Sequence, residues 1–329
     1  MVGERYYSQQ YSLVEPNANG SHVALDQFDD HSYQAYRTQS QASQPARDPF
    51  NDGQSYQKPG PGPNRRRKFL IFGGVTALVL VIALAVGLGV GLTLGNKYDY
   101  TPSFAHVTNA AAFINGGATH KSPWDVNDGI GAGKNEYTYY SGNWTNFPNA
   151  SDWVSFSDMW SNNLHTLQTS CEILGDGKNN SPQDIQDIYD AIQNRANASL
   201  VDHRFIFAVI LQESHGCVRV KATKSSTGVN NPGLMQSHNG HAFSSSHANL
   251  SILAMVQDGT QGTAEGDGLV QNLNYYSNAY SAARGYNSGY IPKSGNLSEA
   301  AGATACYVSD IANRLTGWVN ATSTCPGDS

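Results

Sequence analysis

A segment of 27 uncharged residues, positions 69–95, constrains most strongly how this chain of 329 residues can fold. Its sequence is FLIFGGVTALVLVIALAVGLGVGLTLG. As an α-helix rising about 1.5 Å per residue it would be roughly 40 Å long, which is enough to cross a bilayer with some tilt. The sequence therefore predicts a transmembrane helix here, with the lipid bilayer as its partner.

The charges beside this segment predict its orientation. Four basic residues, positions 65–68, precede it, whereas Lys97 alone follows it. Because positive residues stay on the cytoplasmic side, we expect a single-pass type II membrane protein whose residues 96–329 are extracellular or luminal. We expect a signal anchor and no cleaved secretory signal, because the apolar segment is long and begins far from Met1.

Composition divides the rest of the chain into regions. Residues 1–64 are rich in Gln, Ser, Tyr, Asp, Pro and Gly and have few aliphatic residues, so we expect a disordered cytoplasmic tail before the basic flank and anchor at 65–95. Residues 96–150 contain many turn signals without a sustained period, which indicates a stalk or an irregular N-terminal lobe. The globular domain is expected over residues 151–329.

Helical periodicity dominates the predicted domain. Apolar residues recur at spacings of three and four from Trp153 to Leu167, which predicts a helix. Ser181 before Pro182 is typical of a helix N-terminus, and Asp202 should cap an apolar helix that ends at Glu213.

Further helical patterns cover residues 249–257 and 268–280, and a last one is expected to begin at Ser298 and run through Leu315. No alternating pattern of useful length predicts a strand. The expected fold class is therefore mainly α.

The four cysteines all follow the predicted anchor, where an oxidising compartment permits disulfides. Three pairings are possible, and we favour Cys171–Cys217 with Cys306–Cys325 because the second pair closes a short loop. A metal site is the alternative use of these cysteines, but the C-x-x-C spacing typical of such a site is absent. Seven N-x-[ST] sequons give modest support to a glycosylated ectodomain: Asn143, Asn149, Asn179, Asn197, Asn249, Asn296 and Asn320.

Glu213 is the strongest candidate for chemistry. It follows seven consecutive apolar residues, 205–211, and Gln212, so its carboxyl should lie where a buried helix meets a cleft. Burial favours the protonated carboxyl, which can donate a proton to a leaving oxygen. A buried, ion-paired acid is the alternative interpretation.

The order of three motifs resembles the lysozyme-like superfamily of lytic transglycosylases and goose-type lysozymes, glycoside hydrolase family 23. The first motif is Glu213-Ser214-His215-Gly216, and the second is Gly233-Leu234-Met235-Gln236. The third, Ala283 to Gly289, reads ARGYNSG and carries one extra residue before the tyrosine. The resemblance covers roughly residues 153–318 and implies a lysozyme-like catalytic domain with a substrate cleft.

The resemblance implies that Glu213 protonates the glycosidic oxygen of a β-1,4-linked N-acetylhexosamine polymer. Candidate substrate-binding residues are Ser214, Gly233, Met235, Gln236, Tyr286 and Asn287. Ser214 is expected to orient the Glu213 carboxyl, and Gly233 to let the backbone approach the sugar. Met235 and Leu234 are also typical of a core.

A second carboxylate is not obvious from the sequence. No Asp or Glu lies between Ser214 and Gln257, so the aspartates of goose-type lysozymes have no counterpart there. The remaining candidates are Asp258, Glu265 and Asp267, although Asp258 before a glycine is also typical of a turn. The resemblance therefore favours the transglycosylase route, in which one glutamate acts first as acid and then as base.

Three functions remain open at this stage. Peptidoglycan is the expected substrate of a muramidase or transglycosylase, a chitinase is the enzymatic alternative, and a glycan-binding wall protein without catalysis is the third. The net charge of −6 does not indicate a nucleic-acid partner. We expect no cofactor, and interpret the histidines at 238, 241 and 247 as cleft-wall residues rather than as metal ligands.

Overall fold

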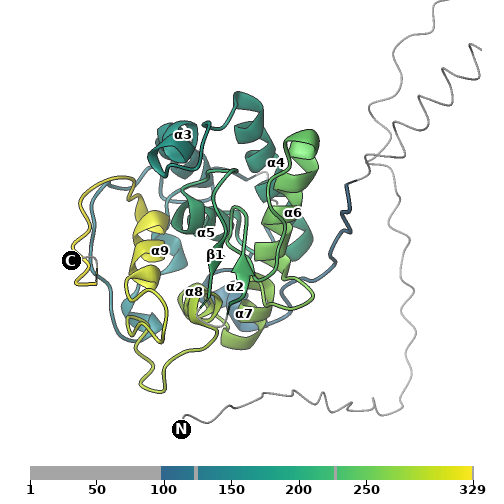
Figure 1. Cartoon of the computed structure of the whole chain (residues 1–329). Coiled ribbons are helices and arrows are strands. Elements are labelled where there is room, and N and C mark those ends of the chain that lie inside the picture. Colours follow the sequence, from purple (N-terminus) through teal and green to yellow (C-terminus); the bar gives the residue numbers. More distant parts are fainter. Residues whose placement is uncertain (1–97, 122–124, 226–227, 328–329) are drawn as a thin grey trace, which may run out of the picture. The chain divides into compact units, whose positions relative to one another are not determined.

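Helix α5, His203–Ser214, lies at the centre of the part of the chain that the structure describes (Figure 1). The structure is a computed structural model, and it describes residues 98–121, 125–225 and 228–327. Every side chain of α5 from His203 to Leu211 is buried. Helices α3 (Phe156–Ile173), α4 (Pro182–Ser199) and α9 (Tyr307–Thr316) pack against it.

The fold is mainly helical, as the sequence predicts. Two-residue strands β1 (Thr223–Lys224) and β2 (Asn230–Asn231) form an antiparallel hairpin in which Thr223 pairs with Asn231. The remaining helices are α2 (Ala110–Asn115), α6 (Ala248–Gln261), α7 (Leu269–Tyr276) and α8 (Ala279–Ser288), with short 3-10 turns at Trp144–Asn146, Ala150–Asp152 and Ser245–His247.

Helix caps explain where α4 and α5 begin. The Ser181 side chain accepts from the Asp184 backbone N–H, and Asp184 reaches back to the Ser181 N–H, which is a capping box with Pro182 at the first helical position. The Asp202 side chain accepts from the Arg204 N–H at the start of α5. The two N-termini expected from the sequence are thus confirmed.

Three predicted helix boundaries were wrong. Trp153 precedes α3, because Ser155 caps the helix, and its buried indole donates to the Tyr280 hydroxyl instead. The helix expected over 268–280 ends at Tyr276, where Ser277 has a φ of 61°, and α8 begins after it. The last helix begins at Tyr307 rather than at Ser298, since turns occupy the residues between them.

Helix α6 is longer than the pattern predicted. It continues through Asp258 and Gly259 to Gln261, so the interpretation of Asp258 as the start of a turn was wrong. Gly259 is required there because a Cβ would lie 2.4 Å from the Cβ of Met235. The helix thus brings its backbone against the Gly233–Gln236 segment.

The described part of residues 96–150 packs onto the helices. Val107, Ala112, Ala118 and Phe147 belong to the same hydrophobic core as α5. The Val107 N–H donates to the Ser199 carbonyl at 2.8 Å. Of the two interpretations of this region, the packing favours an irregular lobe over a stalk.

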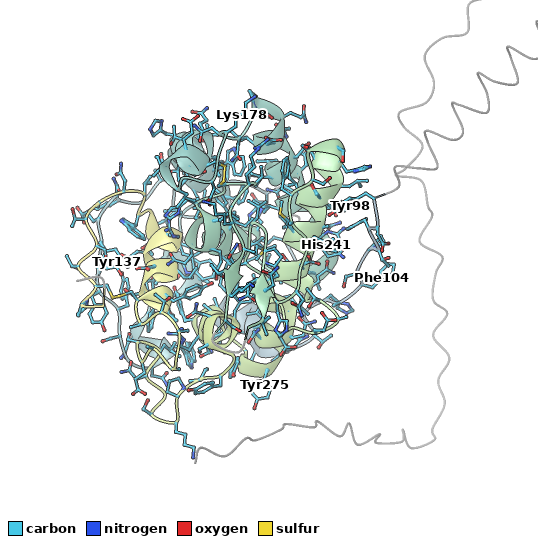
Figure 2. The ribbon with its side chains drawn as sticks, viewed as in Figure 1. Tyr98, Phe104, Tyr137, Lys178, His241 and Tyr275 are labelled. Carbon is cyan, nitrogen blue, oxygen red and sulfur yellow. A yellow bond between two sulfur atoms is a disulfide. The ribbon has the colours of Figure 1, made fainter. Side chains whose placement is uncertain are left out.

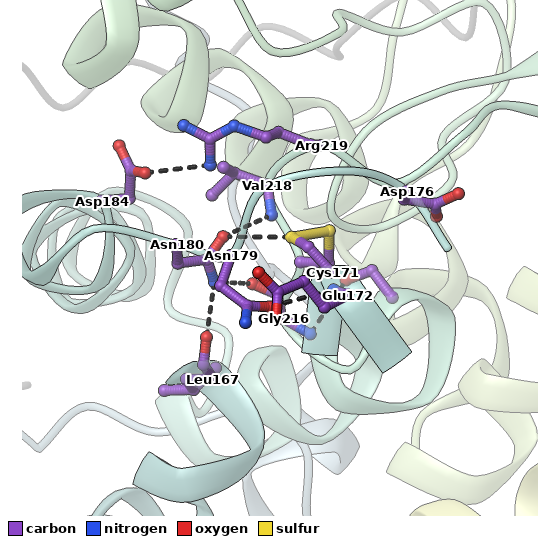
Figure 3. The surroundings of a disulfide bond; sticks show 12 residues. Leu167, Cys171, Glu172, Asp176, Asn179, Asn180, Asp184, Gly216, Val218 and Arg219 are labelled. Atoms are coloured by element: carbon purple, nitrogen blue, oxygen red, sulfur yellow. Dashed lines mark hydrogen bonds and ion pairs between the residues drawn. A yellow bond between two sulfur atoms is a disulfide. The ribbon is translucent and has the colours of Figure 1, made fainter. Parts of the chain in front are cut away.

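Both expected disulfides are confirmed. Cys171, near the end of α3, pairs with Cys217 after α5, and Cys306 before α9 pairs with Cys325. Beside the first disulfide, the Asn180 amide donates to the carbonyls of Leu167 and Gly216, each at 2.8 Å (Figure 3). The turn that ends α5 is therefore fixed to α3 by a covalent bond and by hydrogen bonds.

The predicted tail, basic flank and anchor, residues 1–95, lie outside the described residues. Within the described ranges, no helix combines the length and the apolar character needed to cross a membrane.

Candidate functional site

Glu213 lies in the last turn of α5, where the buried helix reaches a less covered region. Its side chain is partly exposed, while the helix before it is buried up to Leu211. The helix ends because His215 and Gly216 both adopt positive φ, 51° and 74°. The carboxylate Oε1 accepts a hydrogen bond of 2.6 Å from the Tyr307 hydroxyl.

The surroundings of Glu213 keep its carboxyl partly protonated near neutral pH. Burial raises the pKa of this carboxyl to about 7, and the hydrogen bond from Tyr307 opposes part of that increase. The direction agrees with the expectation from the apolar sequence before it. At neutral pH the carboxyl therefore exists in both protonation states, as a group that gives and takes protons requires.

Tyr307 and Tyr286 bring two phenol hydroxyls to this region. Burial, followed by the charge of Glu213, raises the pKa of both hydroxyls, so they remain protonated donors. The Tyr286 hydroxyl donates to the Met235 carbonyl at 2.7 Å and lies 3.5 Å from Ser237 Oγ. The structure thus gathers the three motif segments around Glu213.

Sequence reasoning missed Tyr307 as a site residue. It lies within the last helix that the sequence predicts, and 94 residues separate it from Glu213. Helix α9 packs on α5 and places the phenol beside the carboxyl. No local motif marks this tyrosine, so only the helix packing reveals it.

Ser214 and Gly233 make close contacts within the protein. Ser214 Oγ lies 2.8 Å from the Leu234 carbonyl and 3.0 Å from the Ile210 carbonyl, and it does not contact the Glu213 carboxyl. Gly233 has a φ of 81°, and a Cβ there would lie 2.5 Å from the His241 carbonyl oxygen. Both residues connect the Gly233–Gln236 segment to its neighbours within the protein.

The other predicted sugar-binding residues also make internal contacts. The Met235 side chain is fully buried, which places it in the core. Gln236 accepts from the Thr223 N–H and donates to the Gly233 carbonyl, each at 3.0 Å. Asn287 Oδ1 accepts from the Arg284 guanidinium and from the Thr304 N–H. Gln236 and Asn287 stay partly exposed, so they keep surface for a ligand.

The three candidate second carboxylates lie in different surroundings. Asp258 is buried, and its Oδ2 accepts from the His241 N–H at 2.6 Å and lies 2.7 Å from His241 Nδ1. Burial raises its pKa, and the contacts with His241 oppose that increase. Glu265 and Asp267 are exposed in the turn between α6 and α7. Among the described residues, no carboxylate contributes to the raised pKa of Glu213.

A cluster of acidic and histidine side chains lies at the opposite end of α5 from Glu213. Ligand atoms of Asp128, Asp202 and His203 are within 4.8 Å of one another, as a metal site requires. The Arg204 guanidinium already forms ion pairs with Asp128 at 3.2 Å and with Asp202 at 2.6 Å. The arrangement is therefore a buried ion-pair network at the start of the helix.

The predicted glycosylation sites lie at the surface. Asn143, Asn149, Asn197, Asn249 and Asn320 are exposed, and Asn179 and Asn296 are partly exposed. The Asn249 amide donates to Asp187 at 3.1 Å, so a glycan at that nitrogen would replace this contact.

No protein-family model matches the chain, and no curated protein or solved structure is significantly similar to it.

Proposed function

We propose that this protein is a glycosidase that cleaves β-1,4 bonds of an N-acetylhexosamine polymer, with Glu213 as general acid and then base. The proposal keeps the resemblance to the lysozyme-like superfamily, and with it a substrate cleft beside α5. The observation that carries it is the partly exposed carboxyl at the end of a buried helix, with a pKa of about 7 and a hydrogen bond from Tyr307.

The proposed reaction begins with proton transfer to the leaving oxygen. Protonated Glu213 gives its proton to the glycosidic oxygen while the bond from that oxygen to C1 breaks. The Glu213 carboxylate then takes a proton from the C6 hydroxyl of the same sugar, whose oxygen forms a new bond to C1. The products are a free hydroxyl end and a 1,6-anhydro end, and Glu213 is protonated again.

The surroundings of Glu213 support this route over hydrolysis with two carboxylates. A second carboxylate within about 5 to 9.5 Å would be expected in a typical hydrolase, and its charge would raise the pKa of Glu213 further. Among the described carboxylates, none has such an effect, and Asp258 is engaged by His241. Glu213 would therefore act largely alone.

Peptidoglycan is the proposed substrate, and chitin is the alternative on the same site. We further propose that residues 69–95 anchor the protein in a bilayer and that the domain lies on the extracellular or luminal side. The location agrees with the two disulfides, which persist in oxidising compartments.

The proposal is tested by assaying the protein on bacterial peptidoglycan and on chitin oligomers. Replacing Glu213 with Gln should lower kcat by about a hundredfold to ten-thousandfold, and kcat/KM of the wild type should fall as pH rises above about 7. Glu172→Gln, an exposed carboxyl on α3, is the matched control and should keep full activity.

Mass spectrometry of the products then separates the two routes. Anhydro ends are expected, whereas reducing ends alone would contradict the transglycosylase mechanism. Full activity of Glu213→Gln would eliminate the proposed acid, and binding without turnover on either polymer would favour a glycan-binding protein.

A further inference from the structure

Arg284 is a buried cation close to the proposed site. It lies on α8, two residues before Tyr286, and its side chain is fully buried. Among the described residues, no carboxylate forms an ion pair with it, and its Nε has no hydrogen-bond partner. An isolated buried charge is costly, so its retention calls for a physical explanation.

The guanidinium binds the segment that leads into α9. Nη1 lies 3.0 Å from the Thr304 carbonyl oxygen and 3.3 Å from those of Leu297 and Glu299. Nη2 donates to Asn287 Oδ1, which also accepts from the Thr304 N–H. Both backbone groups of Thr304 are thus held, directly or through Asn287, by the Arg284 side chain.

Thr304 is hydrogen-bonded to Tyr307, the tyrosine that contacts Glu213. The Tyr307 N–H donates to the Thr304 carbonyl at 3.4 Å, so Thr304 begins the turn from which α9 starts. Tyr307 in turn donates from its hydroxyl to Glu213 at 2.6 Å. A continuous set of contacts therefore runs from Arg284 through Thr304 and Tyr307 to the carboxyl.

Electrostatics connect the same residues. Burial and the charge of Glu213 raise the pKa of Tyr307, and the charge of Arg284 opposes that increase. A positive charge near the phenol makes it a better hydrogen-bond donor, and a better donor stabilises the ionised Glu213.

We propose that Arg284 is a positioning residue for Glu213: its guanidinium holds the 297–304 segment so that the Tyr307 hydroxyl stays on the carboxyl, and its charge stabilises the carboxylate that forms after proton transfer. The inference rests on the proposed function for its catalytic meaning. The effect of Arg284 on the ionisation of Glu213, through Tyr307, can be measured without a known substrate.

A purely structural role of Arg284 predicts a different result from the proposed positioning role. If Arg284 only joined the 297–304 segment to α8, its loss would lower stability and leave the pKa of Glu213 unchanged. The decisive readout is therefore the pKa of Glu213 in the full chain purified in detergent, measured by carbon-13 NMR of labelled glutamate and assigned with Glu213→Gln.

Arg284→Gln removes the charge but keeps amide donors for the carbonyl oxygens. We expect the pKa of Glu213 to rise from about 7 by roughly half a unit to one unit, since both the charge and the Tyr307 contact favour the carboxylate. Arg284→Lys keeps the charge and should return the pKa to within about 0.3 units of the wild type. Arg219→Gln is the matched control, because Arg219 pairs with Asp184 and should leave the pKa unchanged.

The path through Tyr307 is tested by a double substitution. In a Tyr307→Phe background, Arg284→Gln should change the pKa of Glu213 by less than half as much as in the wild type. An unchanged pKa in Arg284→Gln, or an equal change in both backgrounds, overturns the proposal. If Arg284→Gln does not fold, Arg284→Met takes its place, because it also removes the charge and keeps a long side chain: a rise in the pKa of Glu213 of roughly half a unit or more supports the role, and an unchanged pKa overturns it.

An activity assay separates this inference from the proposed function. If the wild type cleaves neither polymer, the proposed function fails while the NMR titration still tests Arg284. If it cleaves one of them, Arg284→Gln should lower kcat about tenfold with little change in KM, because the sugar does not need to touch Arg284.

Discussion

At the scale of single residues, the Glu213 carboxyl ionises more easily in the unfolded chain than in the folded protein. A solvated glutamate has a pKa near 4.5, whereas burial raises the pKa of Glu213 to about 7. Between these two pH values the folded protein binds the extra proton, so its stability falls as the pH rises through this range. The full difference, at about 1.36 kcal/mol per pH unit, is roughly 3 kcal/mol.

Glu213→Gln should therefore stabilise the protein at alkaline pH while it removes activity. We expect the free energy of unfolding to increase by up to roughly 3 kcal/mol at pH 8 and to change little at pH 4, where the carboxyl is protonated in both states. Urea denaturation at the two pH values measures this, with Glu172→Gln as the control. An equal effect at pH 4 and pH 8 would contradict the raised pKa of Glu213.

The sequence predicted the raised pKa of Glu213 because the residues that indicate its burial come directly before it in the chain. The apolar residues before Glu213 are enough to predict its raised pKa, and burial is indeed the largest cause. Tyr307 and Arg284 could not be found in this way, because their effect on Glu213 depends on how α8 and α9 pack. The internal contacts of Ser214 and Gly233 could not be predicted either, because they depend on neighbours that are distant in the sequence.

At the scale of elements, the two helix starts predicted from Ser181 and Asp202 were right, whereas other boundaries, including the starts of α3 and α9, were not. Ser181 and Asp202 cap their helices through side-chain hydrogen bonds to nearby residues, which a sequence displays directly. The break at Ser277 and the late start of α9 depend on tertiary packing, which overrides local propensity. The extension of α6 past Asp258 has the same origin, because Gly259 allows close contact with Met235.

Gly233 provides an element-scale test of whether the Gly233–Gln236 segment is shaped by internal packing. Its φ is 81°, and an added Cβ would lie 2.5 Å from the His241 carbonyl oxygen and 2.8 Å from Met255 Cγ. Gly233→Ala should therefore lower the free energy of unfolding by about 3 kcal/mol or more, from backbone strain and overpacking together.

Gly175 is the matched control for this substitution. Its φ is 71°, but nothing lies within 4 Å of an added Cβ, so Gly175→Ala should cost only about 1 kcal/mol. Chemical denaturation of both variants gives the comparison. Equal losses would mean that strain alone acts at Gly233 and that the segment has room to approach a ligand.

At the scale of the whole molecule, residues 98–107 are joined to the domain by several contacts. Gln257 on α6 accepts from the Tyr100 hydroxyl at 2.9 Å and from the Ser103 N–H at 3.0 Å. Gln261 donates to the Ala105 carbonyl at 2.7 Å, and Val107 is buried. Tyr98 and Phe104 lie along the segment that runs beside α6 (Figure 2).

Comparing the stability of chains that begin at residue 98 and at residue 108 tests this packing. Removing residues 98–107 exposes the site of Val107 and removes the backbone acceptors of the Gln257 and Gln261 Nε2 groups, so the shorter chain should be less stable by about 2 to 4 kcal/mol. Phe104→Ser is the control within the segment, because Phe104 is 87% exposed and should contribute little. Equal midpoints in urea for both chains would mean that residues 98–107 do not stabilise the domain, as expected of a stalk.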